Sequence, residues 1–199
     1  MFQSYRIFYS GLWYENPIFR LILGICSSLA VTNRSLNSLA MGLGVTFVLC
    51  CSAYIVSVLR KVIPRQVRMI SYMIIVGTFT IFVDQFLKAY FPIVSKQMGP
   101  YVGLIITNCI IMGRLEAYAI NKQPWFSFVD GLGCGIGYSF LLLLISFIRE
   151  ILGFGSLFGI QILHTTANWV IMVMPPGAFL VLGVLIWVLR TIQGPVKAK

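Results

Sequence analysis

The stretch Leu36–Leu59 reads LNSLAMGLGVTFVLCCSAYIVSVL and carries no charged side chain from end to end. A helix needs about 20 mostly apolar residues to cross the roughly 30 Å hydrocarbon core of a bilayer, so this stretch is long enough to span one. Lipid offers backbone polar groups no hydrogen-bond partners, which makes a helix the expected element. The stretch therefore predicts an integral membrane protein.

The composition of the whole chain agrees with this prediction. Of its 199 residues, 59% are hydrophobic and 10% are charged, and the mean hydropathy is +0.92. A soluble fold of this size needs more polar surface. The net charge of +10 would suit nucleic acid in a soluble protein, but here the basic residues flank apolar runs, where they suit lipid headgroups. We expect contact with membrane lipid and no nucleic-acid partner.

Six apolar runs predict an all-α integral membrane protein with six transmembrane segments in a single membrane domain, residues 1–199. The first and fourth runs are shorter than an ordinary span, so we expect short, broken or re-entrant helices there. The predicted segments are Pro17–Val31, Leu36–Leu59, Met69–Phe91, Gly99–Gly113, Phe128–Ile148 and Trp169–Leu189.

The basic residues between the segments predict the orientation. Loops rich in Lys and Arg stay in the cytoplasm, and an inside N-terminus puts most of the 15 basic residues there. Both termini are therefore expected in the cytoplasm. The residues expected outside are Arg34, Lys88, Lys96 and Arg149; those expected inside are Arg6, Arg20, Arg60, Lys61, Arg65, Arg68, Arg114, Lys122, Arg190, Lys197 and Lys199.

The two halves of the chain resemble each other. A shift of 89 positions places Gly42-Leu-Gly44 on Gly131-Leu-Gly133, Ser57 on Ser146 and Arg60 on Arg149, and a shift of 83 places Cys26 on Cys109. We expect one repeat at about 17–91 and another at about 99–190. Three segments per repeat is an odd number, so the second copy inserts upside down. Such inverted repeats are typical of transporters, whose paired short segments mark the functional site.

Cys26 and Cys109 are the candidate site residues, because each lies on a short segment at the matching place. A buried cysteine is usually a small, inert hydrophobe, and the residues alone leave that alternative open. A disulfide does not suit the expected cytoplasmic orientation. Iron–sulfur clusters take four cysteines, so two would make half a site.

Other candidates have simpler explanations. Cys50, Cys51 and Cys134 have no matched partner, so packing is expected. Asp84 and Lys88 are four residues apart on one helix face, which predicts an interfacial ion pair, with an ion-pathway role for Asp84 as the alternative.

Two charged pairs and one glycine-rich run complete the candidates. Arg114 with Glu116, and Arg149 with Glu150, are expected to mark helix ends. The glycine-rich run at 131–137 lacks the spacing of a nucleotide-binding loop. It is expected to open the fifth segment and to let helices approach closely.

Several of these stretches resemble one known family. Leu23–Thr32 (LGICSSLAVT), Asp84–Tyr90 (DQFLKAY) and Gly103–Ala117 (GLIITNCIIMGRLEA) are similar to the D subunits of the Na+-translocating NADH:quinone oxidoreductases (Nqr), of the NqrDE/RnfAE family. Phe128–Phe158 and the stretch from Pro175 to Thr191 agree as well, so the resemblance covers almost the whole chain. Its most specific element is T-N-C-x-x-M-G-R-x-E-A. Cys134 departs from the family pattern, which has a polar residue there.

The resemblance implies a function. In this family, the D-type chain pairs with its E-type paralogue, and the pair holds a 2Fe-2S cluster within the bacterial cell inner membrane. It implies Cys26 and Cys109 as iron ligands, with the other two cysteines supplied by the E-type chain. The implied role is electron relay from the NADH- and FAD-bearing F-type chain toward FMN and riboflavin on other subunits and then quinone, coupled to Na+ transport. The implied partners are the A, B, C, E and F subunits.

Three alternatives stay open at this point. The E-type chain of the Rnf complex, a ferredoxin:NAD oxidoreductase, shares these motifs. A non-redox inverted-repeat ion transporter would need no iron, and a passive assembly subunit would depend on no single residue.

Overall fold

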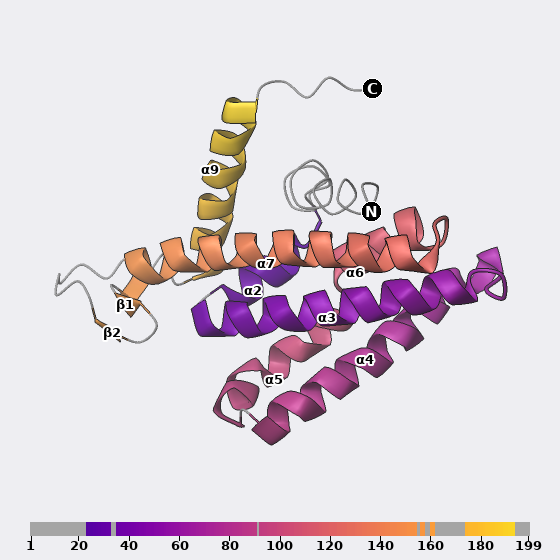
Figure 1. The fold of residues 1–199 in the computed structure, drawn as a ribbon. Helices are drawn as coiled ribbons and strands as arrows, with labels where there is room; N and C mark the ends of the chain where they lie inside the picture. The colour runs from indigo at the N-terminus through magenta and orange to yellow at the C-terminus, as the bar shows by residue number, and fades with distance from the viewer. Residues whose placement is uncertain are drawn as a thin grey trace.

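The structure, a computed structural model, describes residues 23–32, 35–90, 92–154, 156–157, 160–161 and 174–193. In this part of the chain, the regular elements are helices, apart from one antiparallel pair of two-residue strands (Figure 1). The elements are α2 (Ile25–Val31), α3 (Ser35–Leu59), the 3-10 turn η2 (Arg65–Val67), α4 (Arg68–Tyr90), α5 (Pro92–Ile106), α6 (Cys109–Arg114), the π-helical turn η3 (Leu115–Ala119), α7 (Pro124–Phe154), β1 (Ser156–Leu157), β2 (Ile160–Gln161) and α9 (Pro175–Gln193).

Within the described residues, four helical stretches are long and apolar enough to cross a membrane. A fifth apolar helix is shorter, at Pro176–Val188. The prediction of a helical membrane protein is confirmed, and α3 and α4 match the second and third predicted segments within one residue. The six-segment count stays a prediction, because residues 17–22 and 169–173 lie outside the described residues. The four stretches are Ser35–Leu59, Arg65–Tyr90, Tyr101–Ala119 and Pro124–Gly153.

The fourth predicted segment is broken, at a place that its sequence explains. Helix α5 ends at Ile106 and α6 begins at Cys109. Between them Asn108 adopts an extended backbone, and its side chain accepts a hydrogen bond from the Ile110 backbone N–H at 3.0 Å. This is an N-cap, which starts a new helix by satisfying one of its free N–H groups. The predicted helix end after Gly113 is wrong, because the chain continues through Arg114 into η3.

Helix α7 also continues past its predicted end, so the interpretation of Arg149 and Glu150 as a helix end was wrong. Both residues are buried inside α7. Arg149 donates to the Thr32 hydroxyl at 2.6 Å, and the Glu150 carboxylate accepts from the Ser35 backbone N–H at 3.1 Å. Buried charges are tolerated where they are hydrogen-bonded in this way. These contacts fasten the connection between α2 and α3 to α7.

Helices α3 and α7 run side by side in opposite directions through the centre of the molecule (Figure 1). Glycines permit their close approach. A Cβ atom added at Gly135 would lie 2.9 Å from the Cα of Thr46, and one added at Gly131 would lie 3.3 Å from the Cα of Cys50. The prediction that this glycine-rich run lets helices pack closely is confirmed. The run does not open the helix, as was predicted for the fifth segment, because α7 begins earlier, at Pro124.

We expect the substitution Gly135→Ala to destabilise the protein by about 1–3 kcal/mol, because the added methyl group would lie within 3 Å of both the short, branched side chain of Thr46 and its Cα. Gly77→Ala in α4 is the matched control, since a Cβ there has nothing within 4 Å in the described structure. Alanine favours helices over glycine, so the control should be neutral or slightly stabilising. The measurement is the thermal unfolding midpoint of the purified protein. Equal midpoints for the two variants would contradict the close crossing of α3 and α7.

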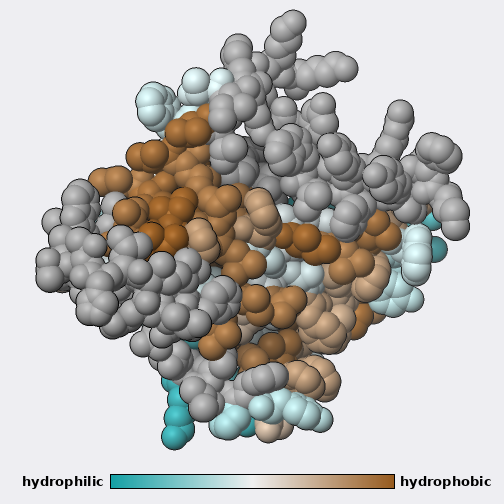
Figure 2. All heavy atoms as spheres, turned by 60° about the vertical axis from the view of Figure 1, so that its left-hand side comes forward, coloured by the Kyte–Doolittle hydropathy of each residue, from teal (hydrophilic) through white to brown (hydrophobic). Residues whose placement is uncertain are grey.

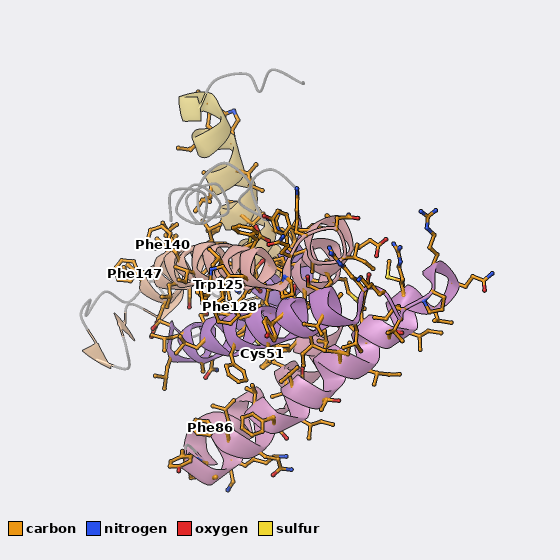
Figure 3. All side chains as sticks on the ribbon, turned by 45° about the vertical axis from the view of Figure 1, so that its right-hand side comes forward. Cys51, Phe86, Trp125, Phe128, Phe140 and Phe147 are labelled. Atoms are coloured by element: carbon orange, nitrogen blue, oxygen red, sulfur yellow. The ribbon has the colours of Figure 1, made fainter. Side chains whose placement is uncertain are left out.

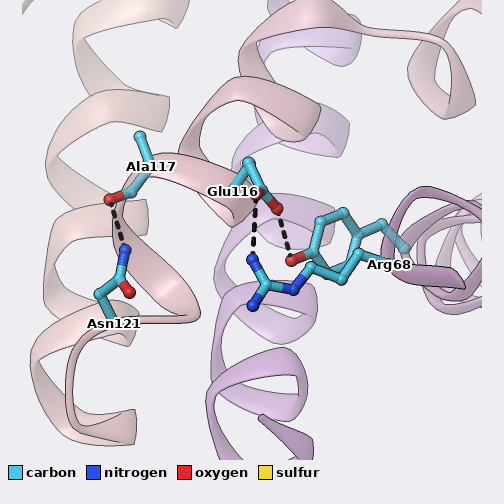
Figure 4. Close-up of polar contacts among 5 residues, drawn as sticks. Arg68, Glu116, Ala117 and Asn121 are labelled. Carbon is cyan, nitrogen blue, oxygen red and sulfur yellow. Dashed lines mark hydrogen bonds and ion pairs between the residues drawn. The ribbon is translucent and has the colours of Figure 1, made fainter. Parts of the chain in front are cut away.

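One end of the molecule gathers many of the basic residues that were expected inside. The C-terminal end of α3, η2, the start of α4, η3 and the start of α7 all lie at this end (Figure 1). Arg68 donates to Glu116 at 3.1 Å, and the Tyr72 hydroxyl donates to the other oxygen of that carboxylate at 2.8 Å (Figure 4). In the turn between η3 and α7, the side chain of Asn121 donates a hydrogen bond to the Ala117 carbonyl at 3.4 Å. Glu116 thus ties η3 to α4.

Large apolar side chains cover much of the surface. In Figure 2, brown apolar residues spread over the middle of the visible face, and paler polar ones gather toward its edges. Phe140 and Phe147 lie outside the ribbon of α7 in Figure 3 and are 62% and 46% exposed. An apolar surface of this extent suits contact with lipid or with other membrane subunits.

Candidate metal centre

Cys26 and Cys109 lie on two short helices that meet. Cys26 is the second residue of α2 and Cys109 is the first residue of α6. Their thiols lie close enough to interact with each other, although 83 positions separate them in the sequence. Both cysteines are free and exposed. The structure therefore brings together the two residues that the sequence selected and leaves them accessible at the surface.

The start of α2 depends on one glycine. Gly24 precedes α2 with a φ of 81°, a left-handed conformation that glycine adopts without strain. A Cβ at Gly24 would lie 2.5 Å from the Cδ1 of Ile110 in α6. The missing side chain thus permits both the turn before α2 and the contact between the two short helices.

Three polar residues connect the cysteine-bearing helices to α7. The Ser27 and Tyr138 hydroxyl oxygens are 2.6 Å apart, and the Asn108 side-chain N–H donates to Ser27 at 3.4 Å. Ser27 follows Cys26 directly and Asn108 precedes Cys109 directly. All three polar side chains are fully buried. The sequence analysis assigned no separate role to any of the three, since a contact with α7 leaves no sequence pattern.

The remaining candidates do not join this site in the described part of the chain. Cys50 and Cys134 are buried, and Cys51 is half-buried. In those residues, no group of three or more His, Cys, Asp or Glu side chains has the arrangement of a metal site.

Asp84 forms the predicted ion pair. Its carboxylate lies 2.6 Å from the Lys88 ammonium group, and the Lys88 side chain is 56% exposed. The pairing itself is confirmed, its place at the membrane interface stays a prediction, and this contact gives no separate support to an ion-pathway role for Asp84.

The structure defines a class of membrane protein in which two short cysteine-bearing helices meet at the surface. They lie next to a crossing of two long helices. The profile of the Rnf-Nqr subunit family, described as membrane proteins, matches residues 4–186. The chain belongs to this family. The family expected from the sequence motifs is thereby confirmed.

Curated relatives match over nearly their full length. The D subunit of the Na(+)-translocating NADH-quinone reductase of Chlamydia trachomatis serovar D is 46% identical over 205 residues, covering 97% of this chain and 96% of the relative. The protein of the same name from Tolumonas auensis is 47% identical over 197 residues, covering 96% and 92%. That from Yersinia pestis strain Pestoides F is 46% identical over 194 residues, covering 94% and 93%.

Proposed function

We propose that this chain is the D-type membrane subunit of a Na+-translocating NADH-quinone reductase. The support is the near-full-length similarity to proteins that carry this name. The same names favour this assignment over the Rnf complex, although the family profile covers both. The proposed location is the bacterial inner membrane, and the proposed partners are the A, B, C, E and F subunits of the complex.

The site function that we propose is to supply half of the ligands of a 2Fe-2S cluster. One observation carries it: the Cys26 and Cys109 thiols meet at the surface of the chain. A 2Fe-2S cluster is held by four cysteine thiolates, and two adjacent thiolates suit one of its two irons. Their exposure leaves the other iron to a partner chain. The chemistry of this donor set therefore fits the cluster, with the paralogous E-type chain supplying the second pair.

The residues of this chain hold and orient the two thiolates in that role. The N-cap at Asn108 and the turn at Gly24 set where the short helices begin, and buried apolar side chains behind them exclude water. When bound, the cluster supplies one-electron transfer. We propose that the chain thereby contributes to electron transfer from the NADH/FAD-bearing subunit toward FMN, riboflavin and quinone on other subunits, coupled to Na+ transport.

We also propose that the chain consists of two inverted repeats, at about 17–91 and 99–190. Contacts between α3 and α7 support it, because they are reciprocal under the shift of 89 positions. Gly42 packs on Ser139, and their counterparts Gly131 and Cys50 pack on each other. Reciprocal contacts of this kind are the mark of a two-fold axis. Since α3 and α7 are antiparallel, such an axis would lie in the plane of the membrane, as an inverted repeat requires.

The arginines at the matched positions support the same proposal. Arg60 donates to the Lys122 carbonyl at 3.2 Å, in the connection that precedes α7. Its counterpart Arg149 donates to Thr32, in the connection that precedes α3. Each arginine thus forms a hydrogen bond with the other half of the chain.

The inverted arrangement predicts which positions are accessible from each side of the membrane. Single cysteines introduced at Arg65 and Lys96 should react with a membrane-impermeant thiol reagent from opposite sides, Arg65 from the cytoplasm. A cysteine at Lys122 is the matched control and should behave like one at Arg65, because both lie at the same end of the molecule. Each variant is compared with the parent chain, which has its own exposed cysteines. Labelling of Arg65 and Lys96 from one side would contradict the topology.

The cluster itself is tested by iron content and low-temperature EPR of the purified complex. Iron that depends on both Cys26 and Cys109 is the expected result. Iron independent of them would contradict the proposed site.

A further inference from the structure

We propose that Tyr138 is a positioning residue, which acts with Ser27 and Asn108 to set the relative placement of Cys26 and Cys109 and so the reduction potential of the cluster. This inference rests on the proposed function, because it concerns the same two thiols. The inference goes beyond the proposed function by assigning a role to a buried tyrosine of α7.

The hydroxyl of Ser27 is the centre of the network. The Gly24 carbonyl, 3.0 Å away, can only accept, so we assign the Ser27 proton to it and treat Ser27 as the acceptor from its other neighbours. These are the Tyr138 hydroxyl at 2.6 Å and the Asn108 side-chain N–H at 3.4 Å. The Asn108 side chain also lies close enough to the Tyr138 hydroxyl to interact with it. With this assignment, Tyr138 donates to Ser27 and joins both halves of the network.

This network joins three separate elements at the cysteines. Ser27 belongs to α2, Asn108 to the break before α6, and Tyr138 to α7. Ser27 and Asn108 are each covalently adjacent to a cysteine, so a shift of either short helix moves one member of the network. Because α7 packs along α3 through the centre of the molecule, Tyr138 ties both short helices to the most extensive helix contact in the described structure.

Burial makes these hydrogen bonds important. Tyr138, Ser27 and Asn108 are fully buried, so water does not replace a lost partner. Hydrogen bonds in such surroundings are electrostatically stronger than in water. The Tyr138 hydroxyl also lies close enough to both thiols to interact with them electrostatically.

The direction of the effect follows from the direction of the hydrogen bond. In the assignment made above, the Tyr138 proton is directed toward Ser27, on the cysteine-bearing side. Reduction adds negative charge to the cluster, and donor protons nearby stabilise that charge. Hydrogen bonds around a cluster are one of the factors that set its potential. Removing the Tyr138 hydroxyl should therefore make the reduced form harder to reach.

The test is Tyr138→Phe in the purified complex, which removes one hydroxyl and keeps the ring that packs on Gly24. We expect wild-type iron content, a midpoint potential shifted to more negative values, and an altered EPR spectrum. Tyr72→Phe is the matched control. Tyr72 is equally buried and its hydroxyl also donates a hydrogen bond, but to Glu116. The control should keep the wild-type potential.

Two further variants keep the test decisive. Ser27→Ala removes the centre of the network and should shift the potential in the same direction. Asn108→Ser retains a capping oxygen for α6 and should shift it less. A wild-type potential and EPR spectrum in both Tyr138→Phe and Ser27→Ala, with iron retained, would overturn this inference and leave the cluster assignment intact. Absence of an iron signal that depends on Cys26 and Cys109 in the wild-type complex would overturn the proposed function itself.

Discussion

Replacing either Cys26 or Cys109 with serine is expected to remove nearly all iron from the site and to bring quinone reduction by the complex down to background. The two thiols meet at the surface as one pair, and a serine hydroxyl is a much poorer iron ligand than a thiolate. NADH oxidation at the flavin-bearing subunit should survive, because that chemistry lies on another chain. The measurements are iron content, low-temperature EPR and quinone reduction.

The double variant should be no worse than either single one. Losing one ligand already empties the site, and residues that act as a unit have non-additive effects. Cys51→Ser is the matched control, because Cys51 is a half-buried cysteine on α3 without a partner thiol in the other half of the chain. It should keep both iron and quinone reduction. Wild-type iron and wild-type quinone reduction in both Cys26→Ser and Cys109→Ser would contradict the relay and favour the ion-transporter alternative.

The pair of cysteines was predictable from sequence because a repeat leaves a pattern. Cys26 and Cys109 occupy matching places on two short segments. The structure places both at helix starts and brings them together. Spacing along the chain was sufficient here, because the match between the two halves is visible without knowledge of any contact.

The role of Tyr138 was not predictable in this way. Its partner Ser27 is 111 positions away, and nothing near Tyr138 distinguishes it from an ordinary aromatic residue at the end of a glycine-rich run. The glycines themselves were informative, because small residues signal a close approach of helices. The approach of α7 to α3 is what brings this part of α7 near the short helices, and that depends on tertiary packing.

The charged residues show the same limit. Arg149 and Glu150 suggested a helix end, since charges in an apolar run usually mark the membrane surface. Their partners Thr32 and Ser35 are more than 110 positions away and satisfy both charges inside the protein. A pattern shows where a charge lies along the chain, but not which distant group binds it.

Among the described residues, the buried ion pair between Arg114 and Asp130 is expected to be the most important charge contact for stability. Both side chains are at most 6% exposed, and Arg114 donates two hydrogen bonds to the Asp130 carboxylate, one at 3.0 Å from its Nε. The Arg114 guanidinium also lies 5.5 Å from the centre of the Tyr118 ring. Arg114 ends α6 and Asp130 belongs to α7. The pair therefore anchors the short helix that carries Cys109.

The substitution Asp130→Leu should destabilise the protein by about 3–5 kcal/mol, because it leaves a buried guanidinium without its carboxylate. Thermal unfolding of the purified complex gives the change. Lys88→Gln breaks the exposed Asp84–Lys88 pair as a matched control and should cost about 0–1 kcal/mol. A second arm is Arg114→Met combined with Asp130→Leu. Replacing a buried pair by apolar side chains is often neutral, so this double variant should unfold at a higher temperature than Asp130→Leu alone. If Asp130→Leu unfolds like Lys88→Gln, the pair does not anchor α6, and the cysteines depend for their placement on the hydrogen bonds of Asn108 and Ser27.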